Sequence, residues 1–356
     1  MRICYLADAG SVLIQMRVGY FAQKGHEVNL ISFRQGKIEG VNFHYMKPPI
    51  PFSYNLSYIL SIPKIRRLVR AINPDILHAY YATSYGFIGA CCDYKPIIIS
   101  CIGSDIMMNP QNLILYKWIT RYALMKATYI TSVSRPITDR IIKLGIEPKK
   151  IQTFPFGIDP QKFFATSQDD KKFALLSLRS LEPIYNIETI LKGFSFLRKE
   201  GFEGRLVIVG GGAEEKRLKK LAKDLGISDY SDFVGVAPHH KVAEYSRASQ
   251  IYLSMSLSDG ASTSFLEAMA CGAFPIVSDI PANREWIVHG ENGFLVSPLD
   301  SRELARCVMQ AFNNPNLMET AAKKNFKLIR NKAILQKNLE KMESIYHLMM
   351  KGTLRA

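Results

Sequence analysis

Two acidic side chains enclose the stretch SDGASTSFLEAMACG in the second half of the chain. Asp259 and Glu267 flank a run of small and hydroxyl residues that leads into an apolar, helix-like segment. Free backbone N–H groups at the start of a helix, together with the positive end of its dipole, form a natural seat for phosphate. Small residues there let a bound group come close to the backbone. The candidate ligand contacts within the stretch are Gly260, Ser262, Thr263 and Ser264.

The same stretch also fits a purely structural interpretation. The order Ser264-Phe265-Leu266-Glu267 matches the S-x-x-E capping box, in which Ser264 accepts a backbone N–H and Glu267 reaches back to the cap residue. Gly272 can then end the helix in a left-handed conformation. One helix can use its glutamate for both purposes, so capping and ligand binding both stay open for Glu267.

Other glycine-rich or polar segments follow strand-like apolar runs. In open parallel sheets, ligands bind beyond the carboxyl ends of the strands, where loops lead into helices. We therefore expect five loops to line one cleft. Their further candidate contacts are Gly10, Gly103, Asp105, Arg179, Gly211 and the backbone near Val236. The loops are Asp8–Ser11, Cys101–Asp105, Leu178–Asn186, Gly210–Glu215 and Ser258–Ser264.

Two of these candidates have structural alternatives. The run Gly210-Gly211-Gly212 is not a dinucleotide fingerprint, because Glu215 stands where the third glycine of G-x-G-x-x-G is needed. Hydride chemistry thereby loses its main support, and the glycines either approach a ligand or only tighten a turn between strand and helix. Asp105 either caps a helix or contacts a ligand.

Strand-like runs alternate with helix-period segments along the chain, which is typical of doubly wound parallel sheets. The pattern restarts after the polar segment ATSQDDKK, which we interpret as a linker. We expect an α/β protein with two Rossmann-like domains, residues 1–165 and 166–335, and a C-terminal helix over about 336–356 that packs back on the first domain. The expected strands are Arg2–Ala7, Val28–Ser32, Ile76–His78, Ile97–Ser100, Tyr129–Val133 and Ile151–Phe154, then Phe173–Leu178, Leu206–Val209, Asp232–Val234, Ile251–Leu253, Phe274–Val277 and Gly293–Val296; the expected helices include Leu13–Lys24 and Leu113–Lys126.

Composition excludes several classes of protein. The chain is 47% hydrophobic and 22% charged, as soluble globular proteins are, and no apolar run reaches the roughly 18 residues that cross a bilayer. The start MRICYLADAG predicts a strand and a glycine turn rather than a secretory signal, so we expect a cytoplasmic protein. The six cysteines form no C-x-x-C pair, and no H-E-x-x-H or His/Asp cluster occurs. Neither disulfides nor a protein-bound metal are expected.

The chain is strongly basic, with a formal net charge of +15. Residues 1–165 carry 20 Lys and Arg against 9 Asp and Glu, a net +11 that places an anionic partner on the first half. The segment PKIRRLVR puts Lys64, Arg67 and Arg70 on one helical flank, and NLILYKWITRYALMK and PPIPFSYNLSYIL are rich in aromatic residues. Such surfaces favour an anionic membrane, although a solvated helix face with ordinary core aromatics would look the same. No nucleic-acid recognition motif accompanies the charge.

The segment from FVGVAPHHKVAEY through SDGASTSFLEAMACG to ENGFLVSPLD, residues 233–300, resembles the most specific block of the retaining glycosyltransferases of the GT-B fold, family four. The segments KGHEVNLIS, DILHAYYATSYGFIGA and FPFGIDPQKF resemble weaker signatures of the same family. The resemblance implies two Rossmann-like domains facing a central cleft, with a nucleotide-sugar donor on the second. The first carboxylate of the family's E-x7-E motif contacts the transferred sugar and the second the ribose, while an arginine and a lysine clamp the diphosphate. By this resemblance, Asp259 would contact the sugar, Glu267 the ribose and Arg179 the diphosphate. The backbone near Val236 would contact the edge of the nucleotide base.

Four positions depart from the family pattern. Asp259 stands where the family has glutamate, which shortens its reach by one methylene. Tyr185 stands where the family has the diphosphate lysine, and Leu13 and Tyr80 occupy positions where histidines are common. The departures indicate either a subfamily with its own donor or a weakened enzyme.

The resemblance implies a retaining, metal-independent, hexosyltransferase-like enzyme without cofactor. It would use a UDP- or GDP-sugar and a lipid-linked saccharide or polysaccharide acceptor, at the inner face of the plasma membrane. In the front-face route of the family, the departing phosphate takes the acceptor proton, so the enzyme supplies positioning and electrostatics. Arg179 and the N–H groups of residues 262–264 would stabilise the leaving charge. Two alternatives are a nucleotide-sugar epimerase, which the replaced histidines disfavour, and a non-catalytic scaffold that binds sugar nucleotides or membrane.

Overall fold

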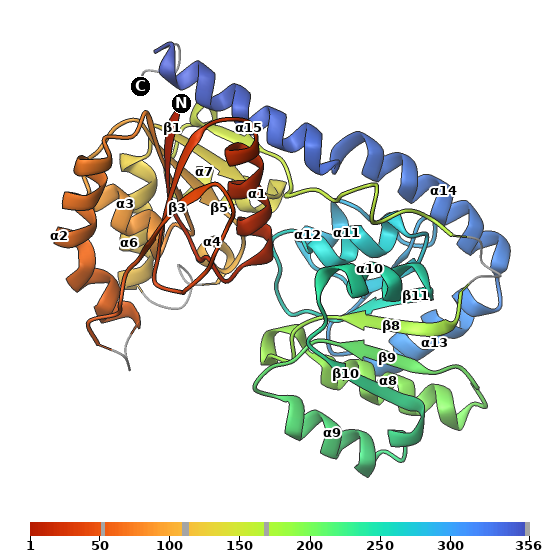
Figure 1. Cartoon of the computed structure of the whole chain (residues 1–356). Helices are drawn as coiled ribbons and strands as arrows, with labels where there is room; N and C mark the ends of the chain where they lie inside the picture. Colours follow the sequence, from red (N-terminus) through yellow and green to blue (C-terminus); the bar gives the residue numbers. More distant parts are fainter. Residues whose placement is uncertain (51–53, 109–113, 167–170, 353–356) are drawn as a thin grey trace. The chain divides into compact units, whose positions relative to one another are not determined.

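The computed structural model describes residues 1–50, 54–108, 114–166 and 171–352 of the 356-residue chain. The chain forms two compact units, one of Met1–Phe156 with Lys337–Ala356 and one of Gly157–Gln336. Each unit is an α/β layer structure around one parallel sheet (Figure 1). Within the described residues, no helix combines the length and the hydropathy needed to cross a membrane.

The first unit is built on a seven-stranded sheet of order β3-β2-β1-β4-β5-β6-β7, in which every neighbouring pair is parallel. Its strands are β1 (Arg2–Leu6), β2 (Glu27–Ser32), β3 (Val41–Tyr45), β4 (Ile76–Tyr80), β5 (Ile97–Cys101), β6 (Tyr129–Ser132) and β7 (Ile151–Thr153). Its helices include α1 (Val12–Gln23), α2 (Tyr54–Ile72), α3 (Tyr85–Cys91), α4 (Ser104–Met107), α6 (Ile114–Lys126), α7 (Arg135–Lys143) and most of α15 (Leu335–Met350).

The second unit is built on a six-stranded parallel sheet of order β10-β9-β8-β11-β12-β13. Its strands are β8 (Phe173–Leu178), β9 (Leu206–Val209), β10 (Ser231–Gly235), β11 (Ser249–Ser254), β12 (Phe274–Ser278) and β13 (Phe294–Val296). Its helices include α8 (Ile187–Lys199), α9 (Glu215–Asp224), α10 (His239–Arg247), α11 (Thr263–Ala270), α12 (Pro281–Arg284), α13 (Ser301–Phe312) and α14 (Pro315–Lys332).

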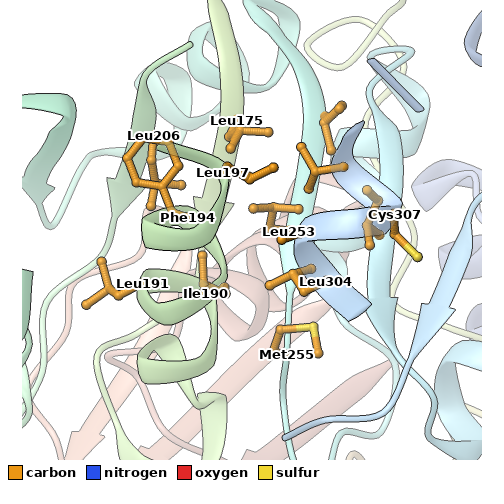
Figure 2. Close-up of a cluster of buried hydrophobic side chains, with 14 of the residues drawn as sticks. Leu175, Ile190, Leu191, Phe194, Leu197, Leu206, Leu253, Met255, Leu304 and Cys307 are labelled. Carbon is orange, nitrogen blue, oxygen red and sulfur yellow. The ribbon is translucent and has the colours of Figure 1, made fainter. Parts of the chain in front are cut away.

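Both faces of the second sheet are buried. Leu175 and Leu253 pack with α8 and α13 on one face (Figure 2). Leu176 and Tyr252, their neighbours in the chain, pack with α10, α11 and α14 on the other. A strand buried on both faces needs apolar side chains at every position, which explains the continuous apolar runs of the sequence.

The fold class predicted from the sequence is confirmed. Each of the expected strands is present, with ends that differ by two residues at most. The strand β3 was not predicted. It is an edge strand with the sequence VNFHY, and its partly exposed, polar residues give no continuous apolar run.

The boundary between the units lies at Phe156, nine residues before the expected one. The N–H of Ile158 donates to the Ala333 carbonyl at 2.8 Å, and the Leu335 N–H donates back to the Ile158 carbonyl at 2.9 Å. Phe163 is buried in the core of the second unit. The chain has therefore joined the second unit well before residue 165.

The polar segment ATSQDDKK is not a linker between the units, which corrects the interpretation of its described part; residues 167–170 lie outside the described residues. The side chain of Lys171 is buried and donates to the carbonyl oxygens of Ser249 at 2.8 Å and Cys271 at 3.1 Å. These bonds tie the start of β8 into the second unit. Polarity alone misled here, because a buried ammonium with several carbonyl acceptors looks like a solvated lysine in the sequence.

The C-terminal helix α15 packs on the first unit through a buried polar network. The Tyr346 hydroxyl lies 2.6 Å from Nδ1 of His78 on β4 and 2.9 Å from the Tyr5 hydroxyl on β1. On the other side of the ring, Nε2 of His78 lies 2.7 Å from the Ser100 hydroxyl. The last helix of the chain thus completes the first unit.

Candidate active site

The strand order places the site at the middle of the second sheet. From β8 the chain continues to β9 and β10 on one side, while β11, β12 and β13 lie on the other. Ligands of doubly wound sheets bind beyond the carboxyl ends of the strands at such a switch point. Arg179 directly follows β8, and the loop after β11 carries Asp259.

The Arg179 guanidinium joins the two loops. Nη2 donates to Oδ2 of Asp259 at 2.6 Å, and Nη1 donates to the Ser262 hydroxyl at 2.5 Å and, more weakly, toward the Ser264 hydroxyl at 3.5 Å. The guanidinium also lies over the Tyr185 ring, 4.0 Å from its centroid. The structure therefore brings together two of the loops expected to line one cleft, while the ligand roles of Arg179 and Asp259 stay predictions.

This ion pair is largely withdrawn from water. Burial by itself lowers the pKa of Arg179, but the Asp259 carboxylate, with smaller contributions from Tyr252 and Tyr185, raises it above its ordinary value. The guanidinium therefore carries a fixed positive charge. Its Nε is buried and has no hydrogen-bond partner in the described structure, so one donor of the cation is unused.

The first turn of α11 is capped by Ser262. Its hydroxyl accepts the Phe265 N–H at 3.3 Å, and helix α11 begins at Thr263. The predicted capping box with Ser264 as the cap is therefore wrong. Ser264 lies inside the first turn, where its hydroxyl is 3.2 Å from the Tyr252 hydroxyl. Gly260 stands before the cap, and its N–H donates to Oδ1 of Asp259 at 2.8 Å.

Glu267 is not a capping residue either. It lies further along α11 with 4% of its surface exposed, and its Oε1 is 2.8 Å from Nε2 of His239. Burial raises the pKa of Glu267, and the hydrogen bond and charge of His239 offset part of that rise. Sequence reasoning missed His239, although it stands in the quoted segment FVGVAPHH at the start of α10.

The glycine run holds the loop after β9 against the loop after β8. A Cβ on Gly210 would lie 2.1 Å from the Arg179 carbonyl oxygen, and one on Gly212 would lie 2.4 Å from that of Leu181. The Leu181 N–H donates to the Gly211 carbonyl at 3.0 Å. The tight-turn alternative therefore accounts for Gly210 and Gly212. Gly211 faces Val236, whose side chain is 84% exposed, so the ligand roles of these two residues stay predictions.

Asn186 is a second residue that sequence reasoning missed. Its backbone is left-handed, with φ of 50°, and its side-chain amide donates to the carbonyl oxygens of Met255 at 3.2 Å and Pro298 at 2.7 Å. It thereby ties together the loops after β8, β11 and β13. Its sequence signal is weak, because the acceptors lie about 70 and 110 residues away in the chain.

The first unit places its candidates at the carboxyl edge of its own sheet. Gly10 is exposed, and its N–H donates to Oδ1 of Asp8 at 2.8 Å. Gly103 is the cap residue of α4, so the capping alternative for Asp105 is wrong. Asp105 is fully buried, and its carboxylate accepts the N–H groups of Ala82 at 2.8 Å and Gly103 at 2.9 Å. This geometry gives Asp105 the role of fixing two loops; the shared cleft and the ligand contacts at Gly10 and Gly103 stay predictions.

The two positions where the family has histidines differ in surroundings. Leu13 lies half-buried in the first turn of α1. Tyr80 ends β4, stacks on His78 with ring centroids 4.6 Å apart, and its hydroxyl accepts a long hydrogen bond of 3.4 Å from Arg17. Among the residues that the structure describes, no group of three or more His, Cys, Asp or Glu side chains could hold a metal ion.

Comparisons with known proteins agree with this arrangement. Residues 159–328 match the sequence model of the family described as glycosyl transferases group 1, and residues 2–134 match that of glycosyl transferase 4-like proteins. The chain is 25% identical over 370 aligned positions to the N-acetyl-alpha-D-glucosaminyl L-malate synthase of Bacillus anthracis, covering 97% of this chain and 95% of that protein.

Solved structures share the fold over nearly the whole chain. HepE of Anabaena, crystallised with UDP-glucose, superposes with a TM-score of 0.81 at 15% identity and covers 97% of this chain and 99% of that one. Sucrose-phosphate synthase of Thermosynechococcus elongatus superposes with a TM-score of 0.82 at 15% identity, covering 98% and 99%. The chain belongs to the group 1 glycosyltransferases and has the GT-B fold.

Proposed function

We propose that this glycosyltransferase moves a hexosyl group from a UDP- or GDP-sugar to a lipid-linked saccharide or polysaccharide, with retention of configuration and without a metal. One observation carries the proposal: a buried arginine, Arg179, is fixed at the N-terminus of α11. Both the guanidinium and the helix N-terminus are positive, and Asp259 is the carboxylate that pairs with them. A diphosphate supplies the negative charge that this arrangement favours.

The diphosphate would lie against the N–H groups of Thr263 and Ser264 and the guanidinium of Arg179. The charge that grows on the leaving group would then meet donors that are already in place, which is the most effective form of electrostatic catalysis. Tyr185, in place of a lysine, contributes no charge, so its role is to hold the plane of the guanidinium. Asp259 would orient hydroxyls of the sugar, and Glu267 would bind the ribose.

The engagement of the two carboxylates supports retention in this proposal. Asp259 is occupied by Arg179 and by the Gly260 N–H, and Glu267 by His239. Both oxygens of Asp259 and one oxygen of Glu267 are therefore already hydrogen-bonded, which disfavours either carboxylate as a base or a nucleophile. In the proposed step, the bond from the anomeric carbon to the diphosphate oxygen breaks and its electron pair stays with the diphosphate. The acceptor hydroxyl oxygen bonds to the anomeric carbon on the same face, and its proton passes to the leaving phosphate oxygen. NMR of the product tests this: an axial donor linkage gives an axial product, and inversion would contradict it.

The donor class is supported by the relatives. HepE was crystallised with UDP-glucose, and the name of the Bacillus anthracis relative specifies an N-acetyl-glucosaminyl product. A panel of UDP- and GDP-sugars, with unfolding temperature as the readout, identifies the donor, because a ligand of the folded state must stabilise it. Transfer of the identified sugar to an acceptor supports the proposal. Interconversion of the sugar without an acceptor would indicate the epimerase, and binding without turnover would indicate the scaffold.

The absence of metal from the proposed reaction has its own test. In the proposed site, Arg179 and the N-terminus of α11 supply the positive charge that stabilises the leaving diphosphate. Turnover should be unchanged in excess EDTA. A requirement for added Mg²⁺ or Mn²⁺ would contradict this part of the proposal.

The acceptor is proposed to reach the first unit from a membrane surface. On α2, Ile59 and Leu60 are exposed, and on α6 Ile114 is 88% and Trp118 60% exposed. Arg66 of α2 and Lys126 of α6 both approach Asp93, just after α3, at 3.7 and 3.9 Å, and both helices contact α3. The exposed cations of these helices include Lys64, Arg67, Lys117 and Arg121. Exposed apolar side chains with basic side chains beside them are suited to bind an anionic bilayer.

Sedimentation with vesicles tests this surface. The protein should bind phosphatidylglycerol vesicles, less so phosphatidylcholine vesicles, and binding should fall as salt rises. The double variant Ile114→Glu/Trp118→Glu should lose binding. Leu299→Glu, which changes an exposed leucine of the second unit, is the matched control and should retain it. Equal binding of all three proteins would exclude the α2 and α6 surface as the docking site.

A further inference from the structure

The second carboxylate of the site has a partner to which no role has been given. Glu267 is buried inside α11, and its Oε1 lies 2.8 Å from Nε2 of His239. His239 is the first residue of α10, and its ring lies against Phe163 with centroids 5.2 Å apart. A side chain from a neighbouring helix, itself held by an aromatic ring, thus fixes one oxygen of the Glu267 carboxylate.

We propose that His239 is a positioning residue for nucleotide binding, which holds the Glu267 carboxylate ionised and turned so that its second oxygen receives the ribose hydroxyls. The inference rests on the proposed function, in which Glu267 binds the ribose. His239 itself touches no ligand in this account. It acts through Glu267.

The physical reason is the burial of the carboxylate. An isolated carboxylate taken out of water prefers to take up a proton, and a protonated carboxyl is a weaker acceptor for two hydroxyl groups. Burial raises the pKa of Glu267, and the hydrogen bond and charge of His239 act in the opposite direction. Without His239 the carboxyl would be neutral at a higher pH and free to rotate.

Several other titratable groups near α11 are neutral or have partners of their own. The Cys271 thiol follows on the same helix, and burial raises its pKa to about 12, so it stays neutral. Tyr252 on β11 is bonded to Ser264. On the neighbouring helices α10 and α14, several charged side chains have partners of their own: Lys241 pairs with Glu244, Lys323 pairs with Glu319, and Arg247 donates to the Lys162 carbonyl. Among the described residues, His239 is the side chain that bonds to the Glu267 carboxylate.

Three variants separate this role from simple packing. His239→Phe keeps a ring against Phe163 but removes the donor. His239→Gln restores an N–H donor at a similar reach. The adjacent His240 is exposed, so His240→Phe makes the same chemical change without touching Glu267. The probes are the nucleoside diphosphate selected by the sugar-nucleotide panel and its 2′,3′-dideoxy counterpart.

In the wild type, loss of both ribose hydroxyls should weaken binding by about tenfold or more. His239→Phe should bind the intact nucleotide about tenfold more weakly and the dideoxy nucleotide about as well as the wild type. The donor KM of His239→Phe should rise while kcat at saturation changes little. As the pH is lowered, the variant should begin to lose nucleotide affinity at a higher pH than the wild type does. His239→Gln should recover most of the discrimination, and His240→Phe should retain all of it.

The double variant His239→Phe/Glu267→Gln keeps the proposal testable if single variants also lose stability. The two changes should be non-additive for nucleotide affinity, because His239 acts only through Glu267. Undiminished ribose discrimination in His239→Phe, or additive losses in the double variant, would overturn the inference and leave the proposed function standing. A wild type that binds no nucleoside diphosphate would instead overturn the proposed function, and this inference with it.

Discussion

Arg17, on α1 of the first unit, is a buried cation that forms no salt bridge within the described residues. Its side chain is 3% exposed, and its guanidinium lies over the Phe156 ring at 4.2 Å. It donates a long hydrogen bond of 3.4 Å to the Tyr80 hydroxyl, while Nε and Nη2 have no partner in the part of the chain that the structure describes. An unpaired buried charge costs stability, and stacking on one aromatic ring offsets only part of that cost.

Arg17→Met should therefore stabilise the protein. A side chain of similar length without charge removes the desolvation cost and keeps the contact with Phe156. A gain of about 1 kcal/mol corresponds to an unfolding temperature about 2 °C higher in a protein of this size. Calorimetry of the variant measures it, with Arg34→Met, at an exposed arginine, as the control. A lower unfolding temperature for Arg17→Met would show that the interactions of the Arg17 guanidinium stabilise the protein by more than the burial of its charge costs.

Whether a site residue could be predicted depends on how close in the chain its interaction partners lie. The position of the loops that carry Arg179 and Asp259 could be predicted, because a strand end followed by a polar loop is a local pattern. His239 and Asn186 were missed, since each acts through hydrogen bonds to other elements that leave no local pattern. Ser264 was assigned the capping role of Ser262, because both positions carry the same residue and the backbone conformation decides between them.

At the scale of elements, the loop after β9 is positioned by its glycines. Gly212 has no room for a side chain, because its Cβ would meet the Leu181 carbonyl oxygen at 2.4 Å. Gly211 is less constrained. Its Cβ would meet the tip of the exposed Val236 side chain at 2.9 Å, and that side chain can move.

Gly212→Ala should accordingly destabilise the second unit far more than Gly211→Ala. We expect about 2 kcal/mol or more for Gly212→Ala, because the backbone of the β8 loop must shift, and about 0.5 kcal/mol or less for Gly211→Ala. Denaturant unfolding of both variants gives the comparison. Equal stabilities would mean that the two loops do not approach each other as closely as the structure has them.

The strands were easiest to predict where apolar residues follow one another in the sequence. Buried central strands such as β5, β8 and β9 have mostly apolar runs and were predicted, whereas the edge strand β3 has no such run and was not expected. The unit boundary was misplaced for a related reason. Lys171 and the residues after Gly157 are bound to distant parts of the second unit, and polarity along the chain carries no information on such bonds.

At the scale of the whole molecule, we expect stability to depend on pH through His78, which is hydrogen-bonded to Tyr346 of the C-terminal helix α15. Burial holds the pKa of His78 well below its ordinary value, with a smaller contribution from Arg17. The folded protein keeps His78 neutral, while the unfolded chain takes up a proton below about pH 6.5. Protons therefore favour unfolding, and stability should fall as the pH drops below that value, by up to about 1.4 kcal/mol per pH unit.

Unfolding temperatures of the wild type and His78→Gln, measured between about pH 5 and pH 8, isolate this effect. The two curves should converge toward low pH, because glutamine does not titrate. Buried Asp105 and Glu267, whose pKa values are raised, also change stability with pH. Their contribution is the same in the wild type and in His78→Gln, so it cancels when the two curves are compared. Parallel curves would contradict the assignment to His78.

The central claim is that a nucleoside diphosphate binds through Arg179 at the N-terminus of α11. The direct measurement is the dissociation constant of the selected nucleoside diphosphate and of its parent nucleoside for Arg179→Gln, with Arg284→Gln as a control at an exposed arginine–aspartate pair of the same unit. Loss of the guanidinium should weaken binding of the nucleoside diphosphate by about tenfold or more and leave binding of the parent nucleoside unchanged. The control variant should bind both ligands as the wild type does. An unchanged affinity for the diphosphate, or an equal loss for nucleoside and diphosphate, would contradict the account.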